Sequence, residues 1–453
     1  MASPSTSDQF TIPFGRDTIS FTLPDGLHGS LATSQTVGAL PVPEAAAHTA
    51  ISNPVGAPRL RDLARGKRRV CIAVTDATRA CPDHVLVPPM LDELRAAGIP
   101  DEAVTILVAV GAHRPSSGEE KRQKLGHDVV QRYRVVDHDA TDIANLVPVE
   151  DGNDGIPFRL NRLAVDADLL LSTGVVEPHQ YAGYSGGGKT VAIGCADEAT
   201  IAYTHGPTML DLPGTRLAQI VGNPFQEAVR RVARAARLAF VGNAILDDEA
   251  RVITIAYGAA EPVHDYLASV AGPLFTSPIA QQVDIAVAGV GYPKDENLYQ
   301  ASRAASYLQF APVPVVRKGG VIVIPAACPE GAGQGAGEQR FLAAMTAPGG
   351  LRAVIERARR DGIRPGEQRA YIMARVLEDA TVIIAGMKDR EAARSVGMIP
   401  ATDLDEALSL AADHVGTPAS VLVVPHALLT LPLVTPSPAR HAGLSPATSL
   451  APA

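Results

Sequence analysis

The chain has 453 residues, too many for one hydrophobic core, which predicts two domains of about 200 residues each. Its 46% hydrophobic and 19% charged content is typical of a globular protein, and its net charge of −8 argues against a nucleic-acid partner. The polar N-terminus and the lack of any apolar run of about 20 residues predict no secretory signal, no membrane span and a cytoplasmic enzyme. Four scattered cysteines without a C-x-x-C pair argue against a disulfide framework or a zinc ribbon.

Irregular or β structure is expected over the first 65 residues or so, before runs rich in Val and Ile that predict buried strands. These runs form two groups: Val70–Thr75, Val104–Val110 and Asp168–Thr173, then Asp284–Ala288, Gly320–Ile324, Ala380–Ala385 and Val421–Val424. Helical patterns such as Pro88–Gly98 and Pro224–Phe240 separate them. Near-continuous apolar strands that alternate with helices indicate parallel pairing. We therefore expect an α/β fold of two domains, each with a mostly parallel sheet flanked by helices.

The boundary between the domains is predicted near residues 271–278, where a Gly-Pro-Leu-Phe-Thr-Ser-Pro stretch interrupts the pattern. This gives an N-terminal cofactor-binding domain over 1–272 and a C-terminal α/β domain over 273–431, with the active site in the cleft between them. Residues 432–453 are low in complexity and rich in Pro, Ser and Ala, which predicts a disordered tail.

Ionisable residues follow each predicted strand of the first group. The first strand runs into Asp76 and Arg79, the second into His113, and the third into Glu177 and His179. In open α/β sheets, ligands bind beyond the carboxyl ends of the strands. The recurrence of such residues at consecutive strand ends therefore predicts a site.

Taken singly, these residues have ordinary structural explanations. A lone histidine is more often a surface or core residue than a catalyst, and Asp76 could cap the turn that follows it. Position beside glycine or proline at a strand end distinguishes His113 and His179 from the other histidines of the chain.

A glycine-rich stretch follows His179. Residues Gly183–Thr190 satisfy the phosphate-loop pattern G-x-x-x-x-G-K-[ST], whose obvious interpretation is a nucleoside triphosphatase. In a true phosphate loop the first glycine follows the strand directly, whereas Gly183 lies nine positions beyond Gly174. No acidic residue at the end of a later apolar strand stands out as a magnesium partner.

The chemistry of this stretch does not depend on that interpretation. Consecutive glycines let backbone N–H groups surround an anion, and Lys189 supplies a positive charge or a nucleophilic amine. The structural alternative is a flexible glycine turn with an exposed lysine. His205, sixteen residues beyond Lys189, is a candidate metal ligand.

Together these motifs resemble the nickel-pincer nucleotide-dependent lactate racemases and related 2-hydroxyacid racemases and epimerases. The matching segments in the first half are Asp76-x-Thr-Arg79, Gly111-x-His113-Arg-Pro115, Glu177-Pro-His179, the loop that ends at Lys189, and His205. In the second half, the segment Tyr292–Gln300 and the glycine-rich Pro325–Gly333 are similar to the family's corresponding segments. The resemblance spans roughly residues 65 to 425, with its parts in order.

The resemblance implies nickel held in a cofactor, pyridinium-3,5-bisthiocarboxylic acid mononucleotide, tethered covalently to Lys189. It implies that His205 is the protein's nickel ligand and that His113 and His179 are the acid–base pair. Further residues would hold the nucleotide or frame the pocket, namely Asp76, Arg79, Ser185, Gly186, Gly187 and Gly188. Tyr299, Gln300 and Arg303 would bind the substrate.

The chemistry of inversion agrees with these roles. A C–H beside a hydroxyl is too weak an acid for a histidine alone to deprotonate. The hydrogen is therefore transferred reversibly, as hydride, to an electrophilic cofactor. A 2-keto acid results while an imidazole takes the hydroxyl proton, and return of the hydride to the other face gives the opposite enantiomer. Two histidines give each enantiomer its own base.

Two departures from the lactate pattern bear on the substrate. Arg303 stands where the family's lactate enzymes carry a Lys for the substrate carboxylate, and Arg reaches a carboxylate differently. The chain has no Trp, although those enzymes place one in the second domain, in a stretch that corresponds to Pro365–Tyr371. A larger or more polar 2-hydroxyacid, such as a dicarboxylate or an aryl- or alkyl-substituted acid, is therefore at least as good an expectation as lactate.

The expected partners are a small-molecule 2-hydroxyacid and, transiently, the proteins that make the cofactor, with no nucleic acid and no membrane. Two competing functions stay open from the sequence: a phosphate-loop triphosphatase, and a non-catalytic nucleotide- or metal-binding protein. The sequence leaves the oligomeric state open.

Overall fold

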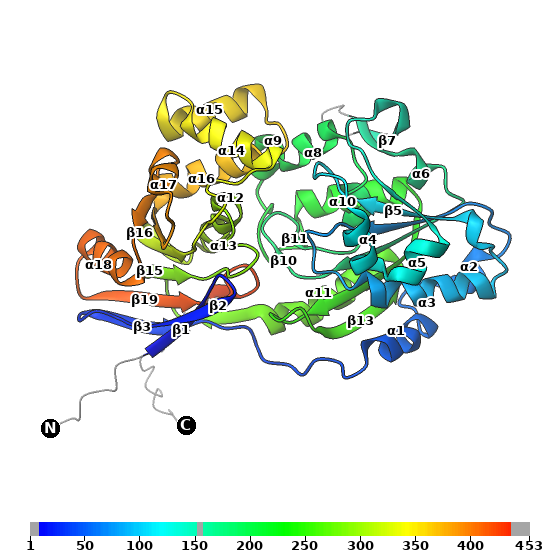
Figure 1. Ribbon diagram of the computed structural model, residues 1–453, viewed down its shortest axis with the longest axis horizontal. Helices are drawn as coiled ribbons and strands as arrows, with labels where there is room; N and C mark the ends of the chain where they lie inside the picture. The colour runs from blue at the N-terminus through cyan, green and yellow to red at the C-terminus, as the bar shows by residue number, and fades with distance from the viewer. Residues whose placement is uncertain (1–8, 152–156, 436–453) are drawn as a thin grey trace, which may run out of the picture.

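The computed structural model describes residues 9–151 and 157–435. Within them, two six-stranded sheets flanked by helices form two α/β domains that lie side by side (Figure 1). No described helix is long and apolar enough to cross a membrane.

The first sheet has the strand order β13-β12-β9-β4-β5-β6. Its strands are β4 (Val70–Thr75), β5 (Val104–Ala109), β6 (Arg134–Asp137), β9 (Leu169–Val175), β12 (Leu238–Leu246) and β13 (Val252–Gly258). All neighbours pair parallel except β13, which lies antiparallel to β12 at one edge.

The second sheet has the order β18-β17-β16-β15-β19-β3, with parallel pairing throughout. Its strands are β3 (Leu27–Leu31), β15 (Val283–Ala288), β16 (Val316–Pro325), β17 (Thr381–Ala385), β18 (Ile399–Ala401) and β19 (Ala419–Val424). The expected α/β fold with mostly parallel sheets is confirmed.

Helices cover both sheets (Figure 1). Those in the sequence of the first domain are α1 (Pro43–Ser52), α2 (Leu60–Ala64), α3 (Asp83–Ala96), α4 (Gly118–Leu125), α5 (His127–Arg132), α6 (Arg162–Val165), α7 (Lys189–Ala192), α8 (Glu198–His205), α9 (Pro207–Leu210), α10 (Pro224–Ala235) and α11 (Ala260–Phe275). Those of the second are α12 (Leu298–Ala301), α13 (Arg303–Gln309), α14 (Ala336–Thr346), α15 (Gly350–Asp361), α16 (Gln368–Asp379), α17 (Arg390–Ser395) and α18 (Leu404–Val415).

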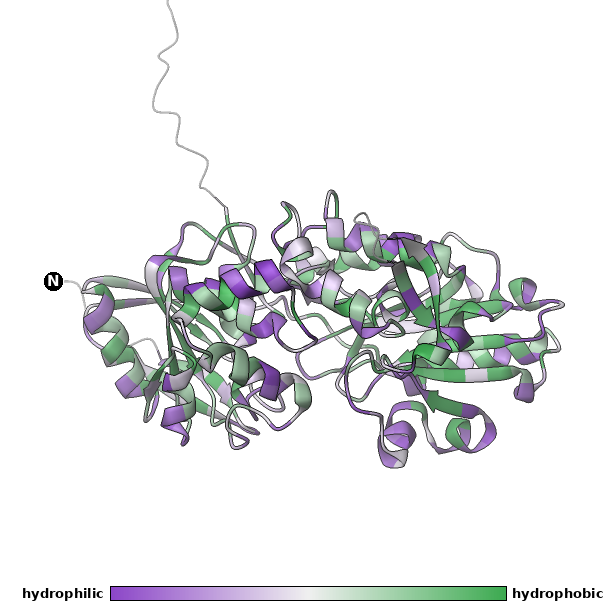
Figure 2. Cartoon of the chain, turned by 90° about the horizontal axis from the view of Figure 1, so that it is seen from above, coloured by the Kyte–Doolittle hydropathy of each residue, from purple (hydrophilic) through white to green (hydrophobic). Residues whose placement is uncertain are grey.

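The central strands are buried on both faces, as their continuous apolar sequences predict. Every residue of β4 is buried, with Cys71 and Ala73 in one hydrophobic cluster and Val70, Ile72 and Val74 in another. The hydropathy colouring in Figure 2 shows these strands as apolar ribbons inside the domains. Because such strands are buried and apolar, the polar residues that could bind a ligand lie just beyond the strand ends.

The structure corrects the predicted extents of both helices named from the sequence. The helix expected over Pro88–Gly98 is α3, which begins earlier, at Asp83, and ends at Ala96. Pro224–Phe240 was expected to be helical throughout, but α10 ends at Ala235 and β12 begins at Leu238. Arg237 adopts a φ of 58°, in the left-handed region that ends helices. The apolar residues that follow therefore belong to the strand.

The N-terminal segment crosses to the second domain, so the range 1–272 does not match sheet membership. Strand β3 pairs with β19, and the hairpin of β1 (Gln9–Phe14) and β2 (Asp17–Thr22) packs against the same domain through Phe10 and Phe21. Residues 9–31 thus belong structurally to the C-terminal domain.

The predicted disordered tail also needs a correction where the structure describes it. Residues 432–434 lie in β20 (Leu431–Val434), which pairs with β14 (Thr276–Ile279). Residues 436–453 lie outside the described residues.

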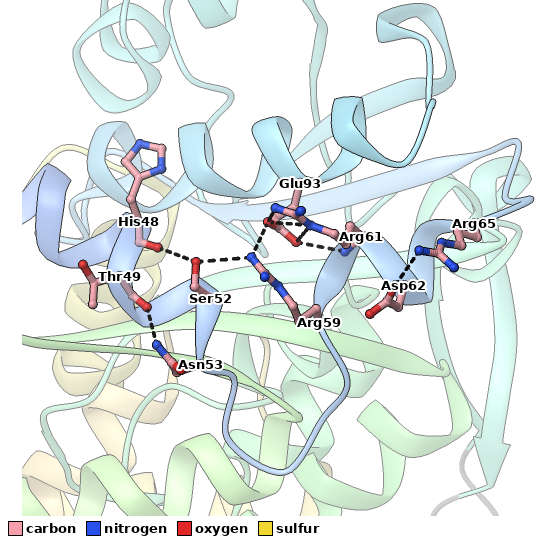
Figure 3. A network of polar contacts seen from close by, with 9 residues as sticks. All are labelled: His48, Thr49, Ser52, Asn53, Arg59, Arg61, Asp62, Arg65 and Glu93. Carbon is pink, nitrogen blue, oxygen red and sulfur yellow. Dashed lines mark hydrogen bonds and ion pairs between the residues drawn. The ribbon is translucent and has the colours of Figure 1, made fainter.

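A buried carboxylate joins α2 to α3. Glu93 of α3 is 5% exposed at its side chain and accepts hydrogen bonds from Arg59 and Arg61, as Figure 3 shows. Burial raises the pKa of Glu93, but the hydrogen bonds and charge of Arg61 outweigh burial and lower it. The ion pairs therefore hold α2 against the first domain.

We expect Glu93→Gln to lower the free energy of unfolding at pH 7 by about 2 kcal/mol, a typical value for hydrogen bonds to a charged group. Because the pKa of Glu93 is lowered on folding, its contribution is present at neutral pH and is lost as the pH falls below about 4 through the folded pKa. Urea unfolding at pH 7 and pH 3 measures the difference. Glu119→Gln, at a carboxylate that is 62% exposed, is the control. An equal Glu93→Gln effect at both pH values contradicts the assignment.

Candidate active site

The ends of three neighbouring parallel strands place the ionisable residues at one edge of the first sheet. Strand β4 lies between β5 and β9, so the segments that follow Thr75, Ala109 and Val175 leave the sheet side by side. The strand-end pattern thus gathers Asp76, His113 and the residues around His179 as the sequence indicated.

Asp76 and His113 form a hydrogen-bonded pair. His113 Nδ1 lies 2.6 Å from Asp76 Oδ2, and Thr78 donates to the other oxygen at 2.8 Å. Burial raises the pKa of Asp76, but the hydrogen bond and charge of His113, with Arg79, outweigh it and lower the pKa to about 2. Asp76 is therefore an anion at neutral pH that orients Nδ1–H of His113 and leaves Nε2 open.

His179 and His205 lie on either side of an aromatic cluster. Phe225 contacts both imidazoles, with ring centroids 6.1 Å from His179 and 5.2 Å from His205. Tyr181 lies edge-on to both, at 5.5 and 5.6 Å. Neither Phe225 nor Tyr181 was singled out from the sequence, because an isolated aromatic residue carries no motif.

The loop after β9 fixes the orientation of His179. Its Nδ1 accepts the backbone N–H groups of Tyr181 and Ala182 at 3.3 and 3.2 Å. Burial, reinforced by the charges of Lys189 and Arg79, lowers its pKa well below the usual value. His179 is therefore neutral, with its proton on Nε2.

His205 presents the opposite nitrogen pattern. Its Nδ1 lies 3.1 Å from the carbonyl of Ile201 one turn back in α8, which it can reach only as a donor. Burial and the charge of Lys189 lower the pKa of His205 to about 3. A neutral imidazole whose Nδ1–H is held by a carbonyl has its Nε2 lone pair free, the usual state of a metal-binding histidine. The described residues contain no group of three or more His, Cys, Asp or Glu that could hold a metal.

Lys189 is the first residue of α7, directly after the glycine run. Burial and the charge of Arg79 lower its pKa to about 7. A substantial fraction of its amine is therefore uncharged at neutral pH and nucleophilic.

The residues before Lys189 are held mainly by the protein itself. The Ser185 hydroxyl donates to the carbonyl of Val175 at 2.7 Å, and the N–H of Gly187 donates to Asn243 Oδ1 at 2.7 Å. A Cβ at Gly186 would lie 2.6 Å from Val176, and one at Gly188 would lie 2.5 Å from Ala233. Packing accounts for these glycines, and the N–H of Gly187 is not available to a phosphate.

This geometry is not that of a phosphate loop. Gly183 belongs to β11 (Gly183–Tyr184), which pairs back onto β10 (Pro178–His179) instead of following a sheet strand. The Thr190 hydroxyl, which would bind magnesium in such a loop, donates to the carbonyl of Thr173 at 2.7 Å. The structure gives the triphosphatase interpretation no support.

The second domain brings Tyr299, Gln300 and Arg303 from α12 and α13. Gln300 Oε1 accepts from Arg303 at 3.4 Å, and the Arg303 guanidinium lies 5.8 Å from the ring centroid of Tyr307. The charge of Arg303 acts on His179 and on Lys189, which lie in the first domain. Arg303, with Gln300 beside it, thus lies near the strand-end residues on the side of the second domain.

Residues that carried no motif complete this side of the cleft. The Ser306 hydroxyl contacts Gln180 Oε1, next to His179, at 2.9 Å and also accepts from Arg369 at 2.9 Å. Lys294, in the segment Tyr292–Gln300, has its pKa lowered to about 8 by burial and by the charge of Arg303. The strand-end rule could not find them because they lie within α13 and α16 or in a loop of the other domain.

A cavity away from the strand-end residues lies behind the glycine run. It has a volume of about 470 Å³, lies between α10 and α11, and is lined by Gly188, Arg230 and His264. Neither His179 nor His205 lines it, so it is not where the strand-end residues meet.

One carboxylate joins the two domains beside His205. Asp211, directly after α9, accepts hydrogen bonds from Arg359 at 2.9 Å, from Arg375 at 3.0 Å and from the Tyr371 hydroxyl. These partners lie on α15 and α16 of the second domain. These three hydrogen bonds, the Asp211 contacts, therefore hold the first domain against the second.

Asp211→Asn should loosen the contact between the domains while leaving each domain folded, because it removes the charge that three donors share. Small-angle X-ray scattering should show a larger radius of gyration than that of the wild type, with an unchanged circular-dichroism spectrum. Asp361→Asn, at an exposed carboxylate of α15 paired with Arg360, is the control. An unchanged radius of gyration for Asp211→Asn would show that the Asp211 contacts do not hold the domains together.

The fold and the polar cleft define a two-domain α/β enzyme, and comparisons with known proteins give its family. Residues 14–217 match the family model described as the lactate racemase N-terminal domain, and residues 279–430 match the lactate racemase C-terminal domain. Curated lactate racemases of Thermoanaerobacterium thermosaccharolyticum and Lactiplantibacillus plantarum are 33% and 34% identical over 424 and 404 residues. These alignments cover 91% and 88% of this chain, and 96% and 91% of the relatives.

Solved structures agree. The lactate racemase apoprotein of T. thermosaccharolyticum superposes with a TM-score of 0.84 at 30% identity, over 94% of this chain and all of that one. A Thermotoga maritima protein, with a TM-score of 0.62 at 19% identity, shares the fold. The chain belongs to the lactate racemase family, which makes it a racemase-type isomerase of a nickel-dependent family. The predicted family and enzyme class are confirmed.

Proposed function

We propose that the chain inverts a 2-hydroxyacid by reversible hydride transfer, with a nickel-pincer nucleotide linked to Lys189. One observation carries the proposal: Lys189, a nucleophilic lysine, acts on His205, a neutral histidine whose Nε2 is open. The described residues offer no complete metal site of their own. A metal carried by a tethered organic group needs few protein ligands. We propose that the proteins that make this group are transient partners.

The residues present fit such a group. Lys189 would hold it through an amide-type bond, and His205 Nε2 would coordinate its nickel. The group would supply an electrophile that stores the substrate's hydride. Arg79, whose charge acts on both Lys189 and His179, would face its anionic parts or the substrate.

The two histidines begin with different nitrogens available. Because Asp76 holds Nδ1–H of His113, the neutral form of this imidazole has its lone pair on Nε2. In that form His113 would accept the hydroxyl proton of a substrate. Nε2 of neutral His179 carries a proton and donates to the substrate oxygen, since its Nδ1 is engaged by backbone N–H groups.

The cleft between the domains protects the keto acid from water. Contacts from α13 to the His179 loop and from Asp211 to α16 close the site on two sides. Gln300 and Arg303 would hold the substrate carboxylate, as the resemblance implied. The relatives are named for lactate, whereas Arg303 and the missing Trp favour another 2-hydroxyacid.

Attachment at Lys189 is tested first by intact mass. We expect protein co-expressed with the cofactor-making proteins to carry an adduct that Lys189→Ala abolishes, because no other amine stands at the start of α7. Lys294→Ala removes a second amine of lowered pKa nearby and is the control that should keep the adduct. An adduct on Lys189→Ala would overturn the proposed tether.

The reactivity of Lys189 gives a second, cofactor-free test. A lysine with a pKa of about 7 is deprotonated above that pH, so its acylation by a succinimidyl ester should fall as the pH drops through about 7. Peptide mass spectrometry measures the rate at each pH. N-α-acetyl-lysine in the same tube, with a pKa near about 10.4, should still be accelerating at pH 9. A parallel rise of both rates to pH 9 contradicts the lowered pKa.

His113→Gln should lower kcat for racemisation by about 10²–10⁴-fold, the usual range for loss of a general base. Asp76→Asn should give a smaller loss, because Nε2 remains but its tautomer is no longer fixed. Chiral chromatography follows each reaction, and His84→Gln, at an exposed histidine of α3, is the control. Wild-type kcat in Asp76→Asn would remove Asp76 from the mechanism.

A further inference from the structure

Two guanidinium groups lie in the cleft without a carboxylate partner. Arg303 of α13 and Arg369 of α16 form no ion pair within the described residues, although most other arginines of the second domain do. Arg303 acts on Arg369 as a like charge. Glu177 acts on Arg303 from a distance without forming an ion pair among these residues.

Arg369 is the more unusual of the two. It is 3% exposed, and its hydrogen bond in the described part of the chain runs from Nη1 to the Ser306 hydroxyl at 2.9 Å. Its Nε is buried with no hydrogen-bond partner there. Burial lowers the pKa of Arg369. An ion buried without a counter-charge costs several kcal/mol, so this arrangement is expected where an anion binds.

A second orphaned polar atom lies in the same cluster. The Tyr181 hydroxyl is buried and has no partner among the described residues, and the charge that acts most on it is that of Arg369. A phenol hydroxyl without an acceptor can donate a hydrogen bond to an anion. Arg369 and Tyr181 come from different domains and together offer two donors to one anion.

Guanidinium groups outnumber the acids around the site. Arg79 and Arg303 act on Lys189 and His179, and Arg303 acts on Arg369. The acids that act on this group are Asp76, already engaged by His113, and Glu177. A monocarboxylate held by Arg303 would leave Arg369 uncompensated.

We propose that the substrate is a 2-hydroxy dicarboxylate, whose C1 carboxylate binds Arg303 and Gln300 and whose second carboxylate binds Arg369 and the Tyr181 hydroxyl. This inference rests on the proposed racemase function and names its substrate class. Arg369 gives this side of the site a buried guanidinium, which can bind a carboxylate through two N–H groups.

The test uses holoenzyme and acids matched in chain length. Chiral chromatography should show kcat/KM for 2-hydroxybutanedioate or 2-hydroxypentanedioate at least about 30-fold above that for the monoacid of the same length, since the monoacid leaves Arg369 unpaired. Arg369→Leu should remove this preference mainly through KM, and Arg369→Lys should restore part of it. Arg352→Leu, at an arginine of α15 that is 86% exposed, should leave the preference unchanged.

Wild-type enzyme alone keeps the proposal testable if Arg369→Leu fails to fold. Butanedioate should inhibit racemisation at concentrations at least about 30-fold below those of butanoate. Equal inhibition, or a preference for monoacids, overturns the dicarboxylate assignment while racemase activity persists. Activity on no 2-hydroxyacid at all would instead overturn the proposed function.

A separate arm distinguishes substrate from cofactor as the anion at Arg369. Intact mass of Arg369→Leu should show the same adduct on Lys189 as the wild type. Loss of the adduct would show that Arg369 holds an anionic part of the cofactor, and it would overturn the proposal.

Discussion

Burial of basic groups between the two sheets is the constraint on which the chemistry of the site depends. Desolvation, reinforced by neighbouring positive charge, lowers the pKa of Lys189, His179 and His205, because each added proton would be buried beside other cations. A neutral amine is a nucleophile and a neutral imidazole is a ligand or an acid–base group. The same field attracts an anionic substrate into the cleft.

Local hydrogen bonds then give the three imidazoles different functions. A carboxylate holds Nδ1–H of His113, backbone N–H groups occupy Nδ1 of His179, and a backbone carbonyl receives Nδ1–H of His205. In the neutral imidazoles, Nε2 thus carries the lone pair in His113 and His205 and the proton in His179. The partners come from a strand end, a tight loop and a helical turn. Local secondary structure therefore determines which nitrogen of each histidine is available.

The sequence predicted what depends on local pattern. Runs such as Val70–Thr75 identified the parallel strands, and the rule that ligands bind at their carboxyl ends located Asp76, His113 and His179. It could not show that β3 joins the distant β19, since strand pairing over such a separation leaves no local signal. Arg369 was also missed, because a buried guanidinium has the same sequence appearance as an exposed one. Only the packing of α16 against α13 reveals that it lacks a counter-charge.

Helix α16 links closure of the domains to the composition of the pocket. Tyr371 and Arg375 bind Asp211 beside His205, while Arg369, less than two turns before Arg375, points toward Ser306 and Tyr181. Arg369 is buried in this arrangement at a cost that an anion beside Tyr181 would offset. A dianionic ligand that also binds Arg303 would therefore stabilise the contact between the domains more than a monoanion.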